Sequence, residues 1–86
     1  MDDKSRDILI RAWPILRKDL EPLKLLPDLV DVLDSKDIDE IGGKNSRVDK
    51  VDELLRILPR RGQKAFEVFK KALQEVQPHL TVYLGE

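Results

Sequence analysis

Apolar residues recur at every third or fourth position along most of this chain of 86 residues, which is the spacing of one face of an α-helix. The first such stripe consists of Leu9, Trp13, Leu16 and Leu20. Pro14 lies inside this stripe, where it has no N–H to donate and its ring crowds the carbonyl four residues earlier. We therefore expect the first helix to bend at Pro14 or to break there into two halves.

Two prolines precede the second stripe. Its apolar positions are Leu26, Leu29, Val30 and Leu33. Pro22 and Pro27 both suit the first turn of a helix, where a missing N–H costs nothing, so the second helix is expected to begin at one of them. A short third element is expected over residues 35–41, capped by Ser35 and ended by the glycines at positions 42 and 43.

The second half of the chain predicts three more helices. Ser46 suits the N-cap of the fourth helix, with Asp49 three residues later as in a capping box, and Pro59 ends that helix. Gly62 begins the turn into the fifth helix, and Pro78 begins a short last one. No pattern of period two competes with these stripes. The predicted fold class is therefore all-α, a compact antiparallel bundle of six helices that forms one domain over residues 1–86.

Composition narrows the class of protein. Charged residues make up 38% of the chain but the net charge is −1, which argues against a nucleic-acid-binding domain, because such domains usually carry a strongly basic patch. The hydrophobic fraction of 41% is enough for a core. No apolar run could span a membrane, and the charged amino terminus lacks the apolar core of a secretory signal. We therefore expect a soluble cytoplasmic protein, or an excised module of one.

The chain offers little for catalysis or metal binding. It has no cysteine, which removes disulfides, cysteine-based zinc sites and a thiol nucleophile. His79, the only histidine, falls in a different element from Ser35, and no nucleophile turn or phosphate-binding glycine loop accompanies them. A lone imidazole is a poor metal site. We therefore predict no enzyme activity, no catalytic residue, no metal, no cofactor and no small-molecule substrate.

The most informative motif is the junction between the fourth and fifth predicted helices. Residues 54–66 read LLRILPRRGQKAF, which resembles the pattern LLxxLPxRGxxAF at the junction of helices 4 and 5 in the caspase recruitment domains (CARDs) of initiator caspases and their adaptors. Residues 1–9, MDDKSRDIL, resemble the opening of the apoptosome scaffold's CARD and of initiator-caspase prodomains. Residues 75–84, EVQPHLTVYL, resemble the short sixth helix of many CARDs. The resemblance thus covers nearly the whole chain.

This resemblance implies a fold and a mode of action. The fold is the Greek-key bundle of the death-fold superfamily, with a bent first helix. The action is homotypic: a CARD recruits a CARD-containing protein, here an initiator caspase, an adaptor or a scaffold, or oligomerises with its own copies, in apoptotic or inflammatory caspase activation. A CARD does no chemistry itself, even as the prodomain of a caspase. Residues 34–41 are shorter than the usual segment of the family, so helix 3 is expected to be little more than one turn.

Members of the family dock a basic surface from helices 1 and 4 on an acidic surface from helices 2 and 3, which implies two sets of partner-binding residues. The basic set is Arg6, Arg11, Arg17, Lys18, Arg47, Lys50, Arg56, Arg60 and Arg61. The acidic set is Asp28, Asp31, Asp34, Asp37, Asp39 and Glu40. The chain has a matching asymmetry, because residues 28–40 carry six acids and one lysine while residues 56–64 carry four cations and no acid. Complementary patches of this kind steer encounter and fix register.

Each of these residues also has a plainer interpretation, because charges on small helical domains mostly face solvent or pair within a helix. Val48 and Asp52 depart from the basic pattern, since they stand where some initiator-caspase CARDs carry arginines. Trp13 is interpreted as a core residue, with an exposed binding anchor as the alternative. Tyr83 is expected to be half-buried with its hydroxyl in water, and His79 to lie on the surface.

Other functions remain open beside recruitment. A CARD-only decoy would use the same surfaces to cap an assembly instead of extending it. The dipeptide Asp34-Ser35 matches the phosphopantetheine attachment site of small helical carriers, but Lys36 replaces the usual leucine and the chain is far more basic than a carrier. A helical nucleic-acid binder would depend on the cation pairs at residues 60–61 and 70–71, which make too small a patch.

Overall fold

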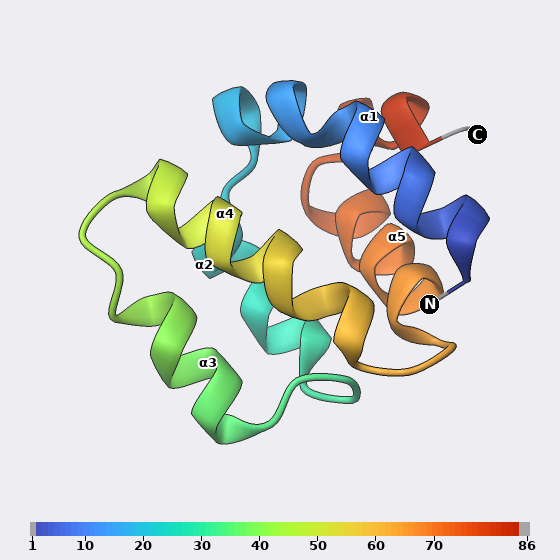
Figure 1. Ribbon diagram of the computed structural model, residues 1–86. Helices are drawn as coiled ribbons and strands as arrows, with labels where there is room; N and C mark the ends of the chain where they lie inside the picture. Colours follow the sequence, from blue (N-terminus) through green and yellow to red (C-terminus); the bar gives the residue numbers. More distant parts are fainter. Residues whose placement is uncertain (1, 85–86) are drawn as a thin grey trace.

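The computed structural model describes residues 2–84, and every regular element in this part of the chain is a helix (Figure 1). The α-helices are α1 (Asp3–Asp19), α2 (Pro22–Leu25), α3 (Ser35–Gly42), α4 (Arg47–Ile57) and α5 (Ala65–Val76). Three 3-10 segments complete the bundle: η1 (Leu26–Leu29) continues α2, η2 (Leu58–Arg60) continues α4, and η3 (Pro78–Leu84) is the last element. With each continuation counted as part of its helix, residues 2–84 form the expected all-α bundle of six helices.

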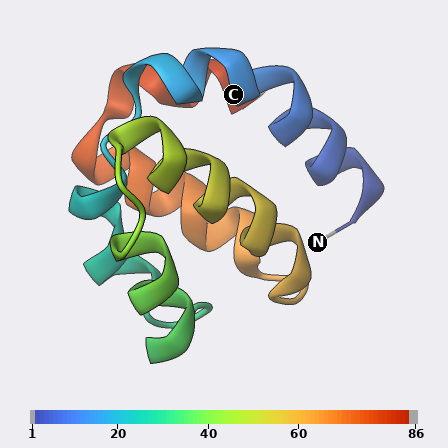
Figure 2. The ribbon, with the colours of Figure 1, turned by 60° about the vertical axis from the view of Figure 1, so that its left-hand side comes forward.

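The first helix stays continuous through Pro14, so the alternative of two separate halves does not occur. Figure 2 shows instead that the axis of α1 changes direction along its length, as expected where a proline removes a backbone hydrogen bond. Asp2 caps the helix, because its carboxylate accepts a hydrogen bond from the N–H of Ser5 at 2.8 Å. Along its curved path α1 packs against both α4 and η3.

The second helix begins at Pro22, the earlier of the two candidates. Pro22 occupies the first position of α2, where its missing N–H costs nothing. Pro27 falls in η1 and leaves the carbonyl of Leu23 without a donor four residues later, which explains why α-helical bonding stops at Leu25. The two segments still form one rod, and both Leu25 and Leu29 are completely buried.

The expectation that Ser35 caps the third helix is wrong, because the cap is Asp34. The carboxylate of Asp34 accepts a hydrogen bond from the N–H of Asp37 at 2.8 Å, and the carboxylate of Asp37 accepts one from the N–H of Asp34 at 3.3 Å. This reciprocal capping box leaves Ser35 as the first helical residue. α3 has eight residues, which is about two turns, so it is short but longer than the single turn expected.

The junction between α4 and α5 folds as its motif predicts. The hydroxyl of Ser46 caps α4 by accepting a hydrogen bond from the N–H of Asp49 at 3.0 Å. α-Helical bonding ends at Ile57, and Pro59 lies in η2. Gly62 has a φ of +97°, in the left-handed region that glycine adopts without strain, and it turns the chain into α5.

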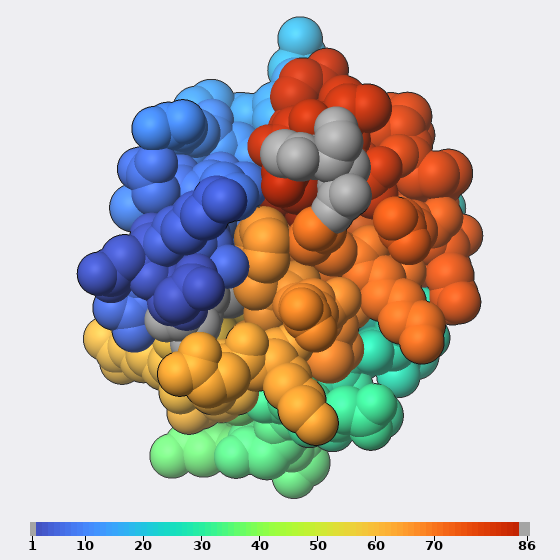
Figure 3. Space-filling view, turned by 90° about the vertical axis from the view of Figure 1, so that its right-hand side faces the viewer, coloured from blue at the N-terminus to red at the C-terminus, as the bar shows by residue number. Residues whose placement is uncertain are grey.

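The core lies where α4 and α5 meet the other helices. Its largest completely buried side chains include Phe69, Leu9, Leu16, Leu54, Leu55, Leu58 and Leu73. Trp13, which was expected in the core, is only partly buried and packs against the edge of this cluster. Tyr83 is 48% exposed, in agreement with the expected half-burial. Figure 3 shows α1 beside α5 and η3, so elements from both ends of the described chain form one side of the molecule. α3 packs mainly on α4, at the opposite edge.

Candidate protein-interaction site

A shallow hollow lies between α1 and α4. It is lined by Ile10, Trp13, Pro14 and Arg17 of α1 and by Asp52 of α4, and we call it the α1–α4 seam. The indole N–H of Trp13 donates to Oδ1 of Asp52 at 2.9 Å, and Nε of Arg17 lies 2.9 Å from the same oxygen. One carboxylate thus joins the two helices and neutralises Arg17, a member of the predicted basic set.

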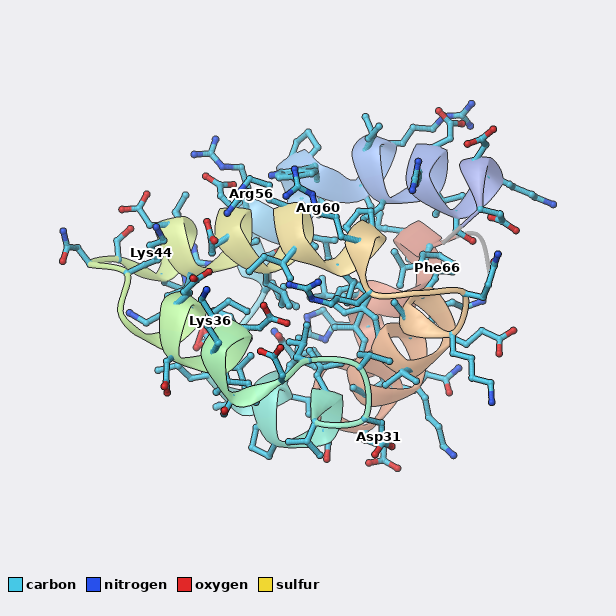
Figure 4. The ribbon with its side chains drawn as sticks, turned by 60° about the horizontal axis from the view of Figure 1, so that its bottom comes forward. Asp31, Lys36, Lys44, Arg56, Arg60 and Phe66 are labelled. Atoms are coloured by element: carbon cyan, nitrogen blue, oxygen red, sulfur yellow. The ribbon has the colours of Figure 1, made fainter. Side chains whose placement is uncertain are left out.

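Other cations of the predicted basic set are exposed on the helices that form this seam. Arg6, Arg11 and Lys18 are exposed on α1, and Arg60 is exposed at the end of α4–η2. Arg11 pairs with Asp7 at 2.8 Å, but both side chains remain more than half exposed. Figure 4 shows Arg60 and Arg56 on the side of α4 toward α1. The exposed cations of α4 therefore face the helix that carries Arg6, Arg11 and Lys18.

Arg56 is held by a carboxylate on its own helix. Glu53 is 8% exposed, and both of its oxygens accept hydrogen bonds from the Arg56 guanidinium. These bonds hold the pKa of Glu53 below its ordinary value of 4.5, against the opposing effect of burial. Nζ of Lys44 lies 3.8 Å from the same carboxylate. Removal of Arg56 would therefore leave a buried carboxylate with one distant cation.

Two further members of the basic set bond to backbone carbonyls. The guanidinium of Arg47 donates to the carbonyls of Leu20 at 2.9 Å and Lys18 at 2.7 Å, at the end of α1. Lys50 donates to the carbonyl of Lys44 at 2.7 Å. Arg47 thus ties the start of α4 to the end of α1, and its charge is largely committed to that contact.

Gln77 holds the same corner from the end of α5, and sequence reasoning missed it. Its side-chain carbonyl accepts a hydrogen bond from the N–H of Glu21 at 2.7 Å, and its amide donates to the carbonyl of Asp19 at 2.9 Å. The two backbone groups lie on either side of Leu20, where α1 has ended and α2 has not begun. Nothing in the local pattern around Gln77 signals a contact more than fifty residues away.

Asp37 and Arg61 were predicted to lie on opposite binding surfaces, but within one molecule they bind each other. Nε of Arg61 donates to Oδ2 of Asp37 at 2.6 Å, and Nη2 donates to Oδ1 at 2.7 Å. Asp37 is 3% exposed, so it is closed to a partner. The Arg61 hydrogen bonds hold the pKa of Asp37 below its ordinary value of 3.8, although burial acts to raise it. The pair fixes α3 to the turn that follows η2.

The remaining acidic set is exposed around η1 and α3. Its members are Asp28, Asp31, Asp34, Asp39 and Glu40. Figure 4 shows Asp31 on the side of the molecule away from α1. Cations on α5 and just before it border this surface, since Asp31 shares one hollow with Asp28 and Lys71 and another with Lys64. The surface is therefore acidic along η1 and α3 but mixed where it meets α5.

The described residues hold no group of three or more histidine, cysteine, aspartate or glutamate side chains placed to bind a metal ion. Within residues 2–84 no helix has both the length and the apolar character needed to cross a membrane. His79 and Ser35 are exposed in separate elements.

A comparison with protein families identifies residues 6–86 as a match to the family described as "Caspase recruitment domain". The match covers nearly the whole sequence and includes both candidate surfaces. Neither a curated protein nor a solved structure matches the chain.

Proposed function

The chain belongs to the caspase recruitment domain (CARD) family, and we propose that it recruits a CARD-bearing initiator caspase, adaptor or scaffold in the cytoplasm. The family acts through homotypic protein–protein interaction in caspase-related signalling, and the domain is an interaction module, not a catalyst. In our proposal the basic surface of α1 and α4 docks on the acidic surface of η1 and α3 of the next molecule. Assembly of several molecules then raises the local concentration of any domain attached to the partner, and this proximity leads to apoptotic or inflammatory caspase activation.

The observation that carries this proposal is the placement of the two surfaces. Arg56 and Arg60 lie on the side of α4 toward α1, while Asp31 lies on the side of the bundle away from α1 (Figure 4). α1 adds exposed cations, interspersed with the exposed acids Asp3, Asp7 and Asp19, and η1 and α3 add exposed carboxylates. A molecule with complementary surfaces on opposite sides binds head to tail, and such contacts propagate because they do not close.

Internal ion pairs reduce the set of charges that we assign to binding. Arg17, Arg47, Lys50 and Arg61 are engaged within the molecule, and so is the buried Asp37. On the basic side we assign binding to Arg6, Arg11, Lys18 and Arg60, with Arg56 held in place by Glu53. On the acidic side we assign binding to Asp28, Asp31, Asp39 and Glu40. Asp34 caps α3 and is also exposed, so we include it in the acidic surface.

Charge reversal tests the proposal. Arg60 and Asp31 are exposed and form no hydrogen bond or ion pair in the described part of the chain, so Arg60→Glu and Asp31→Lys should leave the melting temperature nearly unchanged. Each should weaken assembly, measured by light scattering behind a sizing column at about 0.05 and 0.5 M salt and by capture of caspase and adaptor CARDs. Lys24→Glu and Glu67→Lys, on exposed positions of α2 and α5, are the matched controls.

The decisive arm is an equal mixture of the two charge-reversed variants. If the surfaces meet, the introduced glutamate faces the introduced lysine in the mixture and association partly returns. Absence of recovery, with both variants folded, would mean that these two residues do not face each other. Assembly that is indifferent to both Arg60→Glu and Asp31→Lys would reject the charged surfaces altogether.

One observation favours a decoy as the second candidate. Asp52 takes up the charge of Arg17 in the middle of the basic surface, which weakens that surface relative to the acidic one. A molecule with one strong and one weak surface would join the end of a partner's assembly and stop its growth. Substoichiometric addition to a polymerising CARD distinguishes the two roles, because a recruiter shortens the lag of polymerisation and a decoy shortens the polymers.

A further inference from the structure

Several large hydrophobic side chains lie exposed on the described surface. They are Ile10 at 63%, Leu23 at 57%, Val30 at 60%, Val82 at 62% and Tyr83 at 48%. Only Val30 has carboxylates on both sides in sequence, Asp28 and Asp31, and both are exposed. Leu23 instead shares a hollow with three cations, Lys24, Arg47 and Lys50, and one acid, Glu21. Val82 and Tyr83 have no charged neighbour among the described residues next to them.

The α1–α4 seam has the opposite character. Ile10, Trp13 and Pro14 give it an apolar floor, and Ile10 is the most exposed large hydrophobic residue of the described chain. Arg17 lines the seam too, but Asp52 takes up its charge. Arg56 follows Asp52 by one turn on the same face of α4 and lies with Arg60 on the side toward α1, so these two cations form the rim.

We propose that Val30 of one copy of this chain packs into the α1–α4 seam of a second copy, against Ile10 and Trp13, while Asp28 and Asp31 meet the cations on the rim. This inference rests on the proposed function and deepens it. It names a second copy of the chain as the partner, and an apolar contact as the centre of the interface.

The physical reason for an apolar centre is that exposed charge pairs contribute little affinity by themselves. Interfaces obtain most of their affinity from a few desolvated side chains at the centre, and the surrounding polar contacts exclude water. Charges at the rim mainly set the encounter rate and the orientation. The charged surfaces alone would thus steer two copies together without holding them.

The geometry allows the contact to repeat. The seam lies between α1 and α4, and Asp31, two residues after the end of η1 and next to Val30 in sequence, lies on the side away from α1 (Figure 4). Each copy therefore offers one seam and one Val30 on separate sides. Such a contact is heterologous and generates an open chain of copies.

A matched pair of substitutions tests the contact on the 86-residue chain. Val30→Thr and Val82→Thr make the same change of shape and polarity at positions of equal exposure, 60% and 62%. Burying a hydroxyl where a methyl belongs is unfavourable, so Val30→Thr should weaken self-association about tenfold or more, and Val82→Thr should not. Ile10→Thr should weaken it from the seam side. Sedimentation across a concentration series measures each constant, and circular dichroism checks folding.

Mixing gives a sharper readout than either variant alone. Val30→Thr keeps an intact seam, and Ile10→Thr keeps an intact Val30, so one productive contact can form between them and no chain can grow from it. An equal mixture should therefore give dimers of one copy of each variant, resolved by native mass spectrometry after isotope labelling of one. Absence of such mixed dimers would overturn the pairing of Val30 with the seam.

The charge-reversal variants and the capture experiment separate failure of this inference from failure of the proposed function. If Arg60→Glu disrupts assembly while Val30→Thr and Ile10→Thr behave like Val82→Thr, the charged surfaces stand and the apolar contact is wrong. If the wild-type chain is monomeric throughout but captures a caspase or adaptor CARD, the second copy is wrong as the partner and recruitment stands. If it neither self-associates nor captures a CARD, both proposals fail.

Discussion

We expect the substitution Asp37→Asn to lower the stability of the fold, because this carboxylate joins α3 to the turn after η2 through Arg61. Both carboxylate oxygens accept hydrogen bonds from the guanidinium, at 2.6 and 2.7 Å, and one also accepts the N–H of Asp34 at 3.3 Å. Asparagine has nearly the same shape, but it presents an NH₂ group to one of the Arg61 donors. The change removes one charged hydrogen bond and turns the other into a weaker, charge-to-neutral one.

The magnitude follows from burial on each side of the pair. A hydrogen bond to a charged group contributes roughly 1.5–3 kcal/mol when its partner is buried. The side chain of Asp37 is 4% exposed, but that of Arg61 is 37% exposed, so water can rehydrate part of the freed guanidinium. The expected loss is therefore about 2 kcal/mol, in the middle of the range. For a domain of this size such a loss lowers the melting temperature by roughly 8–16 °C.

Chemical and thermal unfolding followed by circular dichroism measure the effect. The matched control is Asp39→Asn, an exposed position on the same helix, where a change within about 0.5 kcal/mol is expected. A double-mutant cycle with Arg61→Gln isolates the pair, and we expect a coupling energy of at least about 1 kcal/mol.

The reasoning also predicts what Asp37→Asn should leave intact. At a temperature where the variant is folded, its assembly should equal that of the wild type, because Asp37 is 3% exposed and closed to a partner. Equal stability of the Asp37 and Asp39 variants, or assembly lost by a fully folded Asp37→Asn protein, would refute the structural role assigned to this carboxylate.

Three further predictions concern stability. Folding lowers the pKa values of Asp37 and Glu53, so the stabilisation that these carboxylates give is present above their ordinary pKa values of 3.8 and 4.5 and is lost as the pH falls through the lowered values. As the pH is reduced below about 4.5, the melting temperature of the wild type should therefore decrease, and that of Asp37→Asn should decrease less steeply. A parallel decrease in both proteins would contradict this prediction. Gly62→Ala should cost about 1–2 kcal/mol in urea unfolding, because φ is +97° and the added Cβ meets no atom within 4 Å, which leaves backbone strain as the cause. Arg47→Met should cost about 1–2 kcal/mol by the same assay, because two carbonyls at the end of α1 lose a charged donor; an unchanged midpoint would show that water replaces the guanidinium fully.

Much of the helical layout was readable from the sequence because it depends on local chemistry. Prolines and a glycine with positive φ mark helix starts and turns wherever they fall, and Ser46 caps α4 through a neighbour three residues away. The cap of α3 was misassigned because Asp34 and Ser35 both suit the position. The reciprocal bond of Asp37 favours Asp34, and that bond depends on the orientation of a carboxylate that also binds Arg61.

The candidate site was less predictable, because a charge pattern along the chain does not say which charges meet across the fold. Asp37 and Arg61 are 24 residues apart, and Trp13 and Asp52 are 39 apart. The same limit applies to Arg47, whose partners are backbone carbonyls and carry no sequence signal. Counting charges by segment therefore overestimated the number of charged residues free to bind a partner, more on the basic surface than on the acidic one.

The position of Asp52 connects this shortfall to function. Some initiator-caspase CARDs carry an arginine at this position, whereas this chain has the carboxylate of Asp52, which contacts both Trp13 and Arg17. That contact lowers the positive charge of the basic surface at its middle, yet it also holds the indole in place beside the exposed Ile10. A partner that relies on carboxylates alone would meet repulsion from Asp52 at the centre of the surface. A partner that brings an apolar side chain with its carboxylates at the edges would not, since the seam receives the apolar group and the cations lie around it. We therefore expect the charge of a CARD to be a poorer guide to whether it binds this surface than the presence of a hydrophobic residue between its acids.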